Sequence, residues 1–474
     1  MKKTKLLLLL PLVISLAACN TNGDASSGVT ESTNVPTSGS SSTEPEPPAP
    51  EKKSVKVRIP AITTSNYYID VNYDDDYFDQ KSNVFTKELN LLSFAANCVT
   101  DKKDEAYAFF NTMGYDNFFD SGYDAITKDS IGYVLAHKAF ENYDVIAVAI
   151  RGHNYGKEWI NNFTVGKEGN HVGFDAKANE IYDKLVEYVS SFGNKTIKLW
   201  IDGYSRGGAV ANVLASKLLK EREEIKVEKD NIFVYTYEAP RALTEENAVK
   251  YDNVFNIVND MDLIPRLLPQ EYGLFRCGID INIEKDKDVD KAVKDLNIGY
   301  ELPKFTPKPD SGVPYTNECE LLDQLITNLL VEMETAQDVS IATREKYVDN
   351  MEPTITYLIG FFLDLPQSVT LALLASVSSL SEDELKTLFM QILFTDNAIY
   401  TNVLKPVFDA VGYKYDEETL SPNCATAERF LKSKFNIIAS FIDTQAMALD
   451  KEAVANVQRV IAMHYPEVVY ALIK

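Results

Sequence analysis

One short stretch, Trp200-Ile-Asp-Gly-Tyr-Ser-Arg-Gly-Gly-Ala209, links an apolar run to a helical pattern. Within it, Gly203-Tyr-Ser-Arg-Gly207 has the form Gly-x-Ser-x-Gly. Thr196–Ile201 is predicted as a strand before it, and Ala209–Lys220 as a helix after it. This context predicts a sharp strand-to-helix turn that presents the hydroxyl of Ser205, with glycines where side chains would collide with neighbouring backbone. The string alone arises by chance too often to carry meaning, so the flanking elements matter.

Apolar runs alternate with helical patterns on both sides of this turn. Further strands are predicted at Ile131–His137, Asp144–Ile150, Ile232–Tyr237 and Val254–Val258. Helices are predicted at Lys177–Ser190 and, covering one face of the sheet, at Lys87–Val99 and Glu105–Met113. The alternation predicts βαβ units and a mostly parallel sheet, so the fold class is α/β.

A serine hydroxyl needs a base, and the base needs an acid that orients it. The chain has four histidines, and of these only His464 follows Ser205. In α/β-hydrolases the order along the chain is Ser, acid, His, so His464 is the predicted base. It follows the helical run Glu452–Ile461, in a predicted loop. Asp260 and Asp262 follow the last predicted strand, and chain order does not separate these two candidates for the acid.

Several short motifs occur in an order that resembles the class 3 (fungal-type) lipases, which are α/β-hydrolases acting on carboxylic esters. They are Val148-Ala-Ile-Arg-Gly-His153 with Glu158-Trp-Ile160, His171-Val-Gly-Phe174, the Ser205 turn, Glu238-Ala-Pro-Arg241, Asp262-Leu-Ile-Pro265 and His464. The resemblance covers about residues 130–270 and the last twenty. Tyr204 and Arg206 stand where the family more usually has His and Leu.

The resemblance implies a serine ester hydrolase with Ser205 as nucleophile, His464 as base and Asp262, preferred over Asp260, as the acid. It also implies an oxyanion hole formed by the backbone N–H groups of His153 and Arg206, with no metal and no cofactor. His153 replaces the more usual Ser or Thr, and a structural role for its imidazole is favoured. Residues 161–170 occupy the position of the family's lid, but they are short and polar, which does not favour interfacial activation.

The chain is predicted to divide into four parts. A hydrolase core over 54–315 is completed by 452–474, and it is interrupted by a helical insertion or cap over 316–451. In the first 18 residues, charged residues are followed by an apolar run and then by small residues, as in a secretory signal. Leu16-Ala-Ala-Cys19 resembles the lipobox of bacterial lipoproteins. We therefore expect a protein anchored through lipidated Cys19 to the outer face of the cell membrane. An ordinary signal peptide is the alternative. Residues 19–53 are predicted to form a flexible Ser/Thr/Pro-rich tether.

Composition limits the classes of partner. The 474 residues carry 47 Lys and Arg against 70 Asp and Glu, a net charge of -23. This acidity argues against nucleic acid as a partner and leaves a neutral or apolar partner open. Cys98, Cys277, Cys319 and Cys424 have no metal-ligand spacing, and the sequence leaves their pairing open. Tyr73-Asp-Asp-Asp-Tyr77 is interpreted as a solvated acidic turn rather than a calcium site.

Two other function classes stay open at this point. The same fold could bind a lipid or another ligand at the cell surface without turning it over. The same three residues could instead hydrolyse peptides or amides. The intact Ser, Asp and His in the expected order favour ester hydrolysis over both.

Overall fold

The computed structural model describes residues 53–61, 63–64, 67–124, 126–152, 157–193, 195–266, 268, 270–307, 315–323, 343–350, 352, 405–410 and 451–474. The strands are β1 (Lys53–Ile59), β2 (Tyr67–Tyr73), β3 (Asp116–Ser121), β4 (Tyr133–Ala139), β5 (Tyr143–Ile150), β6 (Thr196–Tyr204), β7 (Ile232–Tyr237), β8 (Val254–Val258) and β9 (Ile279–Asn282). The α-helices are α2 (Lys87–Val99), α3 (Lys103–Thr112), α4 (Val172–Ser190), α5 (Arg206–Lys220), α6 (Arg222–Ile225), α7 (Val289–Lys294), α9 (Arg344–Asn350), α13 (Lys405–Ala410), α15 (Lys451–Ala462) and α16 (Pro466–Ile473). Short 3₁₀ helices are η2 (Asp75–Phe78), η3 (Lys157–Phe163), η4 (Lys229–Asn231), η5 (Ile264–Arg266) and η6 (Gln270–Tyr272).

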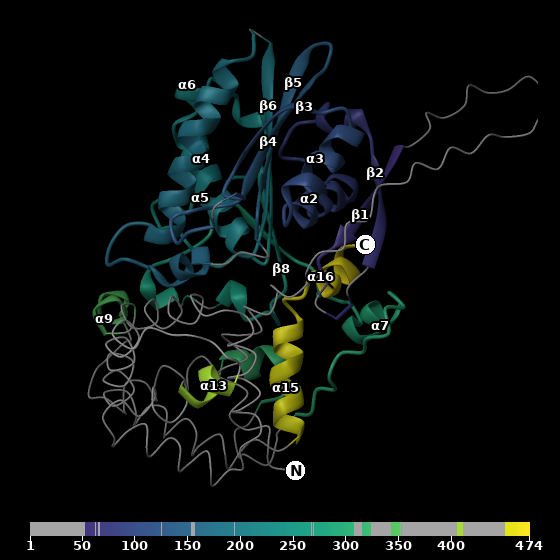
Figure 1. Cartoon of the computed structure of the whole chain (residues 1–474), viewed down its shortest axis with the longest axis vertical. Coiled ribbons are helices and arrows are strands. Elements are labelled where there is room, and N and C mark those ends of the chain that lie inside the picture. Colours follow the sequence, from purple (N-terminus) through teal and green to yellow (C-terminus); the bar gives the residue numbers. More distant parts are fainter. Residues whose placement is uncertain are drawn as a thin grey trace, which may run out of the picture.

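Seven of these strands form one sheet in the order β3-β4-β5-β6-β7-β8-β9 (Figure 1). β4 pairs antiparallel with β3 and β5, whereas β5 to β9 run parallel. Parallel neighbours need crossovers, which α4 supplies between β5 and β6 and α5 between β6 and β7. Because crossovers of one hand place their helices on the same face, α4 and α5 pack together there. The prediction of a mostly parallel α/β sheet is confirmed.

Both faces of the sheet are buried. Alternate side chains point to opposite faces, so Val145 of β5 joins one apolar cluster and Ile146 joins the other. The first cluster lies under α2 and α3, as Figure 1 shows, and it contains Trp200. The indole N–H of Trp200 donates to Ser93 Oγ of α2 at 2.8 Å, so this buried polar group is satisfied. The second cluster lies under α4 and α5.

The C-terminal helix α16 returns the end of the chain to the core. It packs against α2 and α7, with Val468 and Leu472 fully buried. The turn between α15 and α16 is thereby held near the end of β6, where Tyr204 Oη donates to the carbonyl of His464 at 2.9 Å. None of the helices in the described ranges is long and apolar enough to cross a membrane.

Two predicted parts fall largely outside the described residues. Residues 1–52, which hold the predicted signal peptide, Cys19 and nearly all of the tether, are among them. Most of the predicted helical insertion (316–451) lies outside as well. Its described pieces are helical, namely 318–323, α9 and α13.

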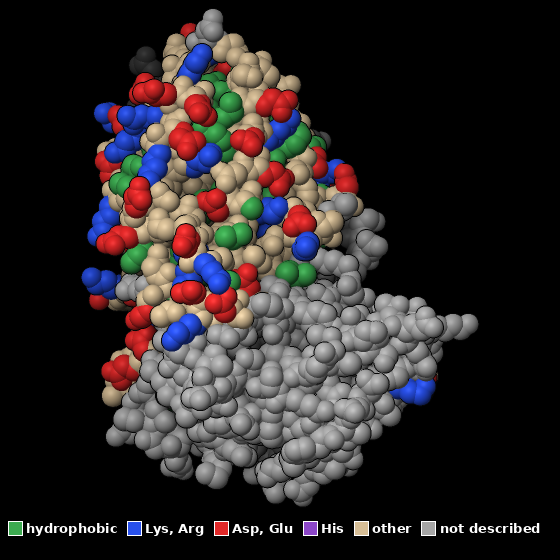
Figure 2. Space-filling view, turned by 90° about the vertical axis from the view of Figure 1, so that its left-hand side faces the viewer, with side chains coloured by type: hydrophobic (Ala, Val, Ile, Leu, Met, Phe, Trp, Pro, Cys, Tyr) green, Lys and Arg blue, Asp and Glu red, His purple; other side chains and the backbone are tan. Residues whose placement is uncertain are grey.

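The surface over α4 mixes charges of both signs. Figure 2 shows Lys and Arg side chains lying beside Asp and Glu on this face, without a patch of one sign. Ion pairs formed by residues of α4 and α5 include Lys184 with Glu187 at 2.8 Å and Lys217 with Glu221 at 3.2 Å. This face therefore offers no cationic surface for a polyanion.

Candidate active site

Parallel strands deliver polar residues to one edge of the sheet. Arg151 directly follows β5, Ser205 follows β6, Glu238 follows β7, and Asp262 lies in the loop after β8. Because these four strands are parallel neighbours, their carboxyl ends meet at the same edge. This edge is where open α/β sheets form their sites.

Ser205 occupies the sharp turn that the sequence predicts. Its backbone has φ 52° and ψ -122°, a conformation that costs a non-glycine residue roughly 1–3 kcal/mol. The turn is also crowded. A Cβ on Gly203 would lie 2.3 Å from the carbonyl oxygen of Gly207, and one on Gly207 would lie 2.5 Å from that of Ile150. The two glycines are therefore required for the strand and helix to meet at this angle.

The three predicted triad residues lie in hydrogen-bonding contact. His464 Nε2 is 2.9 Å from Ser205 Oγ, and its Nδ1 is 2.5 Å from Asp262 Oδ2. The second oxygen of Asp262 accepts the backbone N–H of Ile264 at 2.9 Å. Asp262 is fully buried and Ser205 is only 6 % exposed, so these contacts are shielded from bulk water.

Tyr204 contacts both the backbone and the ring of His464. Its hydroxyl donates to the carbonyl oxygen of His464, and the two ring centroids are 5.4 Å apart. Tyr204 is fully buried at the end of β6. The sequence marks this position only as a departure from the family's usual residue, and the contact depends on α15 and α16 returning to the sheet.

The structure separates the two candidate acids. Asp262 hydrogen-bonds His464, whereas Asp260 is at the surface and its Oδ2 accepts the side-chain N–H of Asn282 at 2.5 Å. The other described histidines lie elsewhere. His137 is placed between Asp116 and Asp144, and His171 caps α4, where burial lowers its pKa to about 3.

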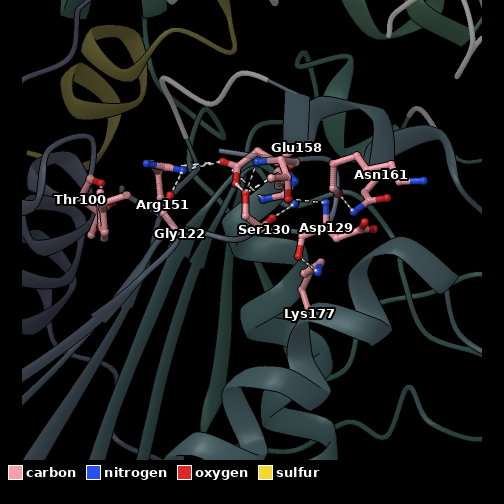
Figure 3. Close-up of polar contacts among 12 residues, drawn as sticks. Thr100, Gly122, Asp129, Ser130, Arg151, Glu158, Asn161 and Lys177 are labelled. Atoms are coloured by element: carbon pink, nitrogen blue, oxygen red, sulfur yellow. Dashed lines mark hydrogen bonds and ion pairs between the residues drawn. The ribbon is translucent and has the colours of Figure 1, made fainter. Parts of the chain in front are cut away.

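A buried charged group lies on the other side of Ser205. We call Arg151, Glu158 and Arg206 the guanidinium cluster; their side chains are 2 %, 0 % and 1 % exposed. Glu158 Oε1 is 2.9 Å from Arg151 Nη2 and 3.9 Å from Arg206 Nη1. Figure 3 shows the Arg151–Glu158 pair beside Ser130, whose hydroxyl reaches Glu158 Oε2 at 3.4 Å.

The guanidinium cluster is anchored to backbone on both sides. Arg151 Nη2 donates to the carbonyl of Gly122 at 2.9 Å, and Arg206 Nη2 to that of Ser130 at 3.4 Å. Arg151 and Glu158 were noted in sequence motifs, but their pairing was not foreseen. The signal was an Arg directly after an apolar strand and an acid seven residues later.

The first turn of α5 begins at Arg206, next to Ser205. The first N–H groups of a helix have no partner within it, so the Arg206 N–H, next to Ser205 in the chain, needs an acceptor outside α5. His153, the other predicted donor of the oxyanion hole, lies outside the described residues.

The polar segment 163–170 is held by one arginine of α9. The guanidinium group of Arg344, which is 8 % exposed, donates to carbonyl oxygens along this segment. These are the carbonyls of Val165, Gly166, Glu168, Gly169 and Asn170, at 2.5–3.1 Å. Glu352 completes the clamp by accepting the N–H of Val165 at 2.9 Å. This part of the predicted lid region is therefore fastened to described pieces of the insertion.

Other candidate ligand groups are engaged in ordinary contacts. In the part of the chain that the structure describes, no three His, Cys, Asp or Glu side chains are grouped to hold a metal ion. Asp75 of the acidic turn pairs with Lys138 at 2.5 Å, and Asp74 caps η2. Cys98, Cys277 and Cys319 are free thiols, and Cys424 lies outside the described ranges.

The sheet, the strained serine turn and the Ser205–His464–Asp262 contacts define the class: this chain has an α/β-hydrolase fold. Residues 147–272 match the model of the lipase (class 3) family, a span that includes the second half of β5, the Ser205 turn and Asp262. The match covers the region where the sequence motifs resemble that family.

A curated relative is similar over part of the chain. It is the secreted mono- and diacylglycerol lipase 1 of Fusarium solani, 29 % identical over 198 residues. The match covers 38 % of this chain and 52 % of the relative, so the chain spans about half the length of the curated relative it matches.

Solved structures of fungal lipases are also similar. The Rhizomucor miehei triacylglyceride lipase is 20 % identical, with 41 % of this chain and 77 % of that one covered and a TM-score of 0.32. The lipase of Rhizopus microsporus var. chinensis is 16 % identical, with 43 % and 77 % covered and a TM-score of 0.33. Because these TM-scores are low, we assign the fold from the strand order of this chain alone.

Proposed function

We propose that this chain is a serine-dependent carboxylic ester hydrolase of the lipase or esterase type. Ser205 is its nucleophile, His464 its general base and Asp262 the acid that orients the base. The substrate class is an acylglycerol or another lipid ester. The observation that carries the proposal is the continuous set of contacts from Ser205 Oγ through His464 to Asp262, at 2.9 and 2.5 Å.

The chemistry follows from these positions. His464 Nε2 takes the proton of Ser205 as Oγ attacks the ester carbonyl carbon, and Asp262 stabilises the imidazolium that forms. The negative charge on the carbonyl oxygen is stabilised by the Arg206 N–H and, in the proposal, by that of His153. His464 then gives its proton to the leaving alcohol. Water attacks the resulting acyl-enzyme by the reverse sequence and releases the carboxylic acid.

Similarity supports the substrate class. The relative from Fusarium solani is named a mono- and diacylglycerol lipase, and the family that residues 147–272 match is named for lipases. The clamp holds segment 163–170, part of the predicted lid region, in place. This supports activity on esters dispersed in water, with no lipid–water interface needed to displace a lid first.

The test uses an organophosphonate that phosphonylates active serines. We expect labelling of the purified protein and turnover of p-nitrophenyl esters and glycerides, both abolished in Ser205→Ala. Ser191→Ala is the matched control, because Ser191 Oγ only bonds the carbonyl of Tyr188 at the exposed end of α4. Labelling that persists in Ser205→Ala would falsify the nucleophile. Labelling without ester turnover, but with cleavage of amides, would favour a peptidase or amidase.

We also propose that the protein is exported and held at the outer face of the bacterial cell membrane by lipid on Cys19. The support is the order of charged, apolar and small residues over 1–18, followed by Cys19. The Fusarium solani relative is named as secreted, which supports export. The test is metabolic labelling with an alkynyl fatty acid. We expect the label in the membrane fraction to be lost in Cys19→Ala, while Cys98→Ala retains it; an unlabelled wild-type protein would rule out the anchor.

A further inference from the structure

Glu238 is a buried carboxyl group that the proposed chemistry does not use. It directly follows β7, is fully buried and has φ 47°, a left-handed conformation that is unfavourable for a glutamate. Its Oε2 accepts the backbone N–H of Asn259 at 3.0 Å. Its Oε1 has no hydrogen-bond donor among the described residues, and the carboxyl group contacts that of Asp262.

Among the residues that the structure describes, no Lys or Arg lies where it would balance the charge of Glu238. Within the described ranges, no Lys or Arg side chain forms an ion pair with Glu238 or Asp262, which we call the carboxyl pair. Tyr204 and Glu284 are the other titratable groups that interact with Glu238. Two adjacent carboxylates in a buried site cannot both be ionised without a large cost, so the pair retains a proton.

The hydrogen bonds indicate which member carries that proton. Asp262 faces the Nδ1 of His464 and accepts the N–H of Ile264, and both contacts favour a carboxylate. Glu238 accepts one backbone N–H through Oε2, and its Oε1 has no hydrogen-bond partner among the described residues. Burial first, and the charge of Asp262 second, raise the pKa of Glu238 well above its usual range.

We propose that Glu238 is a positioning residue that stays protonated and donates a hydrogen bond from its carboxyl group to the carboxylate of Asp262. The bond fixes the rotamer of Asp262 so that its other oxygen faces His464. This inference rests on the proposed triad, and it adds a neutral carboxylic acid behind the orienting acid. A glutamate in a strained backbone conformation fits such a role, because a strained position persists only where its surroundings hold it.

Two variants test the contribution of the Glu238 side chain to the position of Asp262. Glu238→Gln keeps a neutral donor of similar size, whereas Glu238→Gly removes the donor and suits the positive φ, so it is expected to fold. We expect kcat of Glu238→Gln within about threefold of wild type, and a loss of about 10–100-fold in Glu238→Gly because Asp262 is no longer held in line. Full kcat in Glu238→Gly would overturn the proposal.

The pH profile reports the charge on Glu238 directly. If Glu238 is neutral, Glu238→Gln changes no charge and the acid limb of kcat/KM stays in place. If Glu238 is ionised, the substitution removes a negative charge beside the Asp262–His464 pair and moves that limb to lower pH. A shift of about one pH unit therefore contradicts the proposal.

A stability measurement keeps this inference separate from the proposed function. A raised pKa means that the folded state retains a proton that the unfolded state loses above about pH 4.3, so stability falls as pH rises toward the raised pKa. Relative to Glu238→Gln, the wild-type Tm is expected to fall between about pH 5 and pH 8. Parallel Tm curves would overturn the proposal even in a protein without esterase activity. If the Tm curves diverge but the protein has no esterase activity, the proposed function is wrong and the inference about Glu238 stands.

Discussion

The carboxyl pair and the guanidinium cluster lie on opposite sides of Ser205 and carry opposite charge. Glu238 and Asp262 follow β7 and β8, whereas Arg151 follows β5 and Arg206 begins α5. With Glu238 protonated, the carboxyl pair has one negative charge beside His464. The guanidinium cluster has two cations and one anion, Glu158.

The difference matches the charges that the proposed ester hydrolysis develops. The imidazole becomes positive as it takes the serine proton, and the carbonyl oxygen becomes negative. A net anion on the first side and a net cation on the second stabilise both charges together. Buried groups do this with little screening by salt or water.

The largest expected effect comes from the anion beside the base. Asp262→Asn is expected to lower kcat by about 10⁴-fold, because an amide stabilises the wrong tautomer of His464 and no imidazolium. The measurement is p-nitrophenyl ester turnover at saturating substrate. Asp260→Asn, two residues away at the surface, is the matched control and should keep kcat within about twofold. A larger loss of kcat in Asp260→Asn than in Asp262→Asn would mean that Asp260, and not Asp262, is the orienting acid.

The second-largest effect is expected at Glu158, the anion of the guanidinium cluster. Glu158→Gln is expected to reduce the free energy of unfolding by about 3–5 kcal/mol, because two buried guanidinium groups lose their carboxylate. Urea unfolding followed by circular dichroism measures it. The control is Glu180→Gln, which removes a partly exposed pair with Lys177 and should change stability by no more than about 1 kcal/mol. Equal losses in the two variants would show that the cluster does not need its anion.

Asp101, which interacts with Arg151 of the guanidinium cluster, makes the stability of the fold depend on pH. Burial raises its pKa to about 7, while Arg58 and Arg151 act in the opposite direction. The folded state therefore holds a proton that the unfolded state has lost, and the associated stability falls as pH rises from about 4 through 7. We expect Asp101→Asn to reduce this fall by about 2 kcal/mol between pH 5 and pH 8, measured as Tm. Exposed Asp124→Asn is the control, and identical slopes in both variants would contradict the shift.

The smallest effect concerns the segment that follows η3. Arg344→Ala removes hydrogen bonds to carbonyls from Val165 to Asn170, and we expect about tenfold faster amide exchange along 163–170. Global stability should change little because α9 lies outside the sheet. Hydrogen-exchange mass spectrometry measures it, with exposed Glu345→Ala as the neighbouring control. Unchanged exchange in Arg344→Ala would mean that other contacts hold the segment.

The central strands could be predicted from the sequence, and the edge strands could not. β7 and β8 have the predicted bounds because fully buried parallel strands are continuous apolar runs. β3 was missed, since Asp116–Ser121 is half-exposed and contains an irregular register with β4. β1 and β2 alternate buried and exposed residues, so each has one face toward the core and one toward solvent. α4 begins five residues before the predicted Lys177 because His171 caps it.

The candidate site divides in the same way. Ser205 follows from a local motif, and His464 follows from the scarcity of histidine. Asp260 and Asp262 are two residues apart, so only the direction of each side chain separates them. Glu238 belongs to a motif visible in the sequence, but its relation to Asp262 depends on β7 and β8 being neighbours. The clamp by Arg344 joins residues 174–179 positions apart, which no local pattern encodes.

The distance along the chain between the triad residues has a consequence for the order of assembly. His464 is 259 residues from Ser205 and 202 from Asp262. During synthesis Ser205 and Asp262 emerge long before His464, so the proposed nucleophile and acid lack their proposed base until late in elongation. Closing a loop of this length costs more entropy than any local contact in the sheet, and it is favourable only once α16 packs on α2. Activity should therefore appear as the last event of folding, after the sheet is complete.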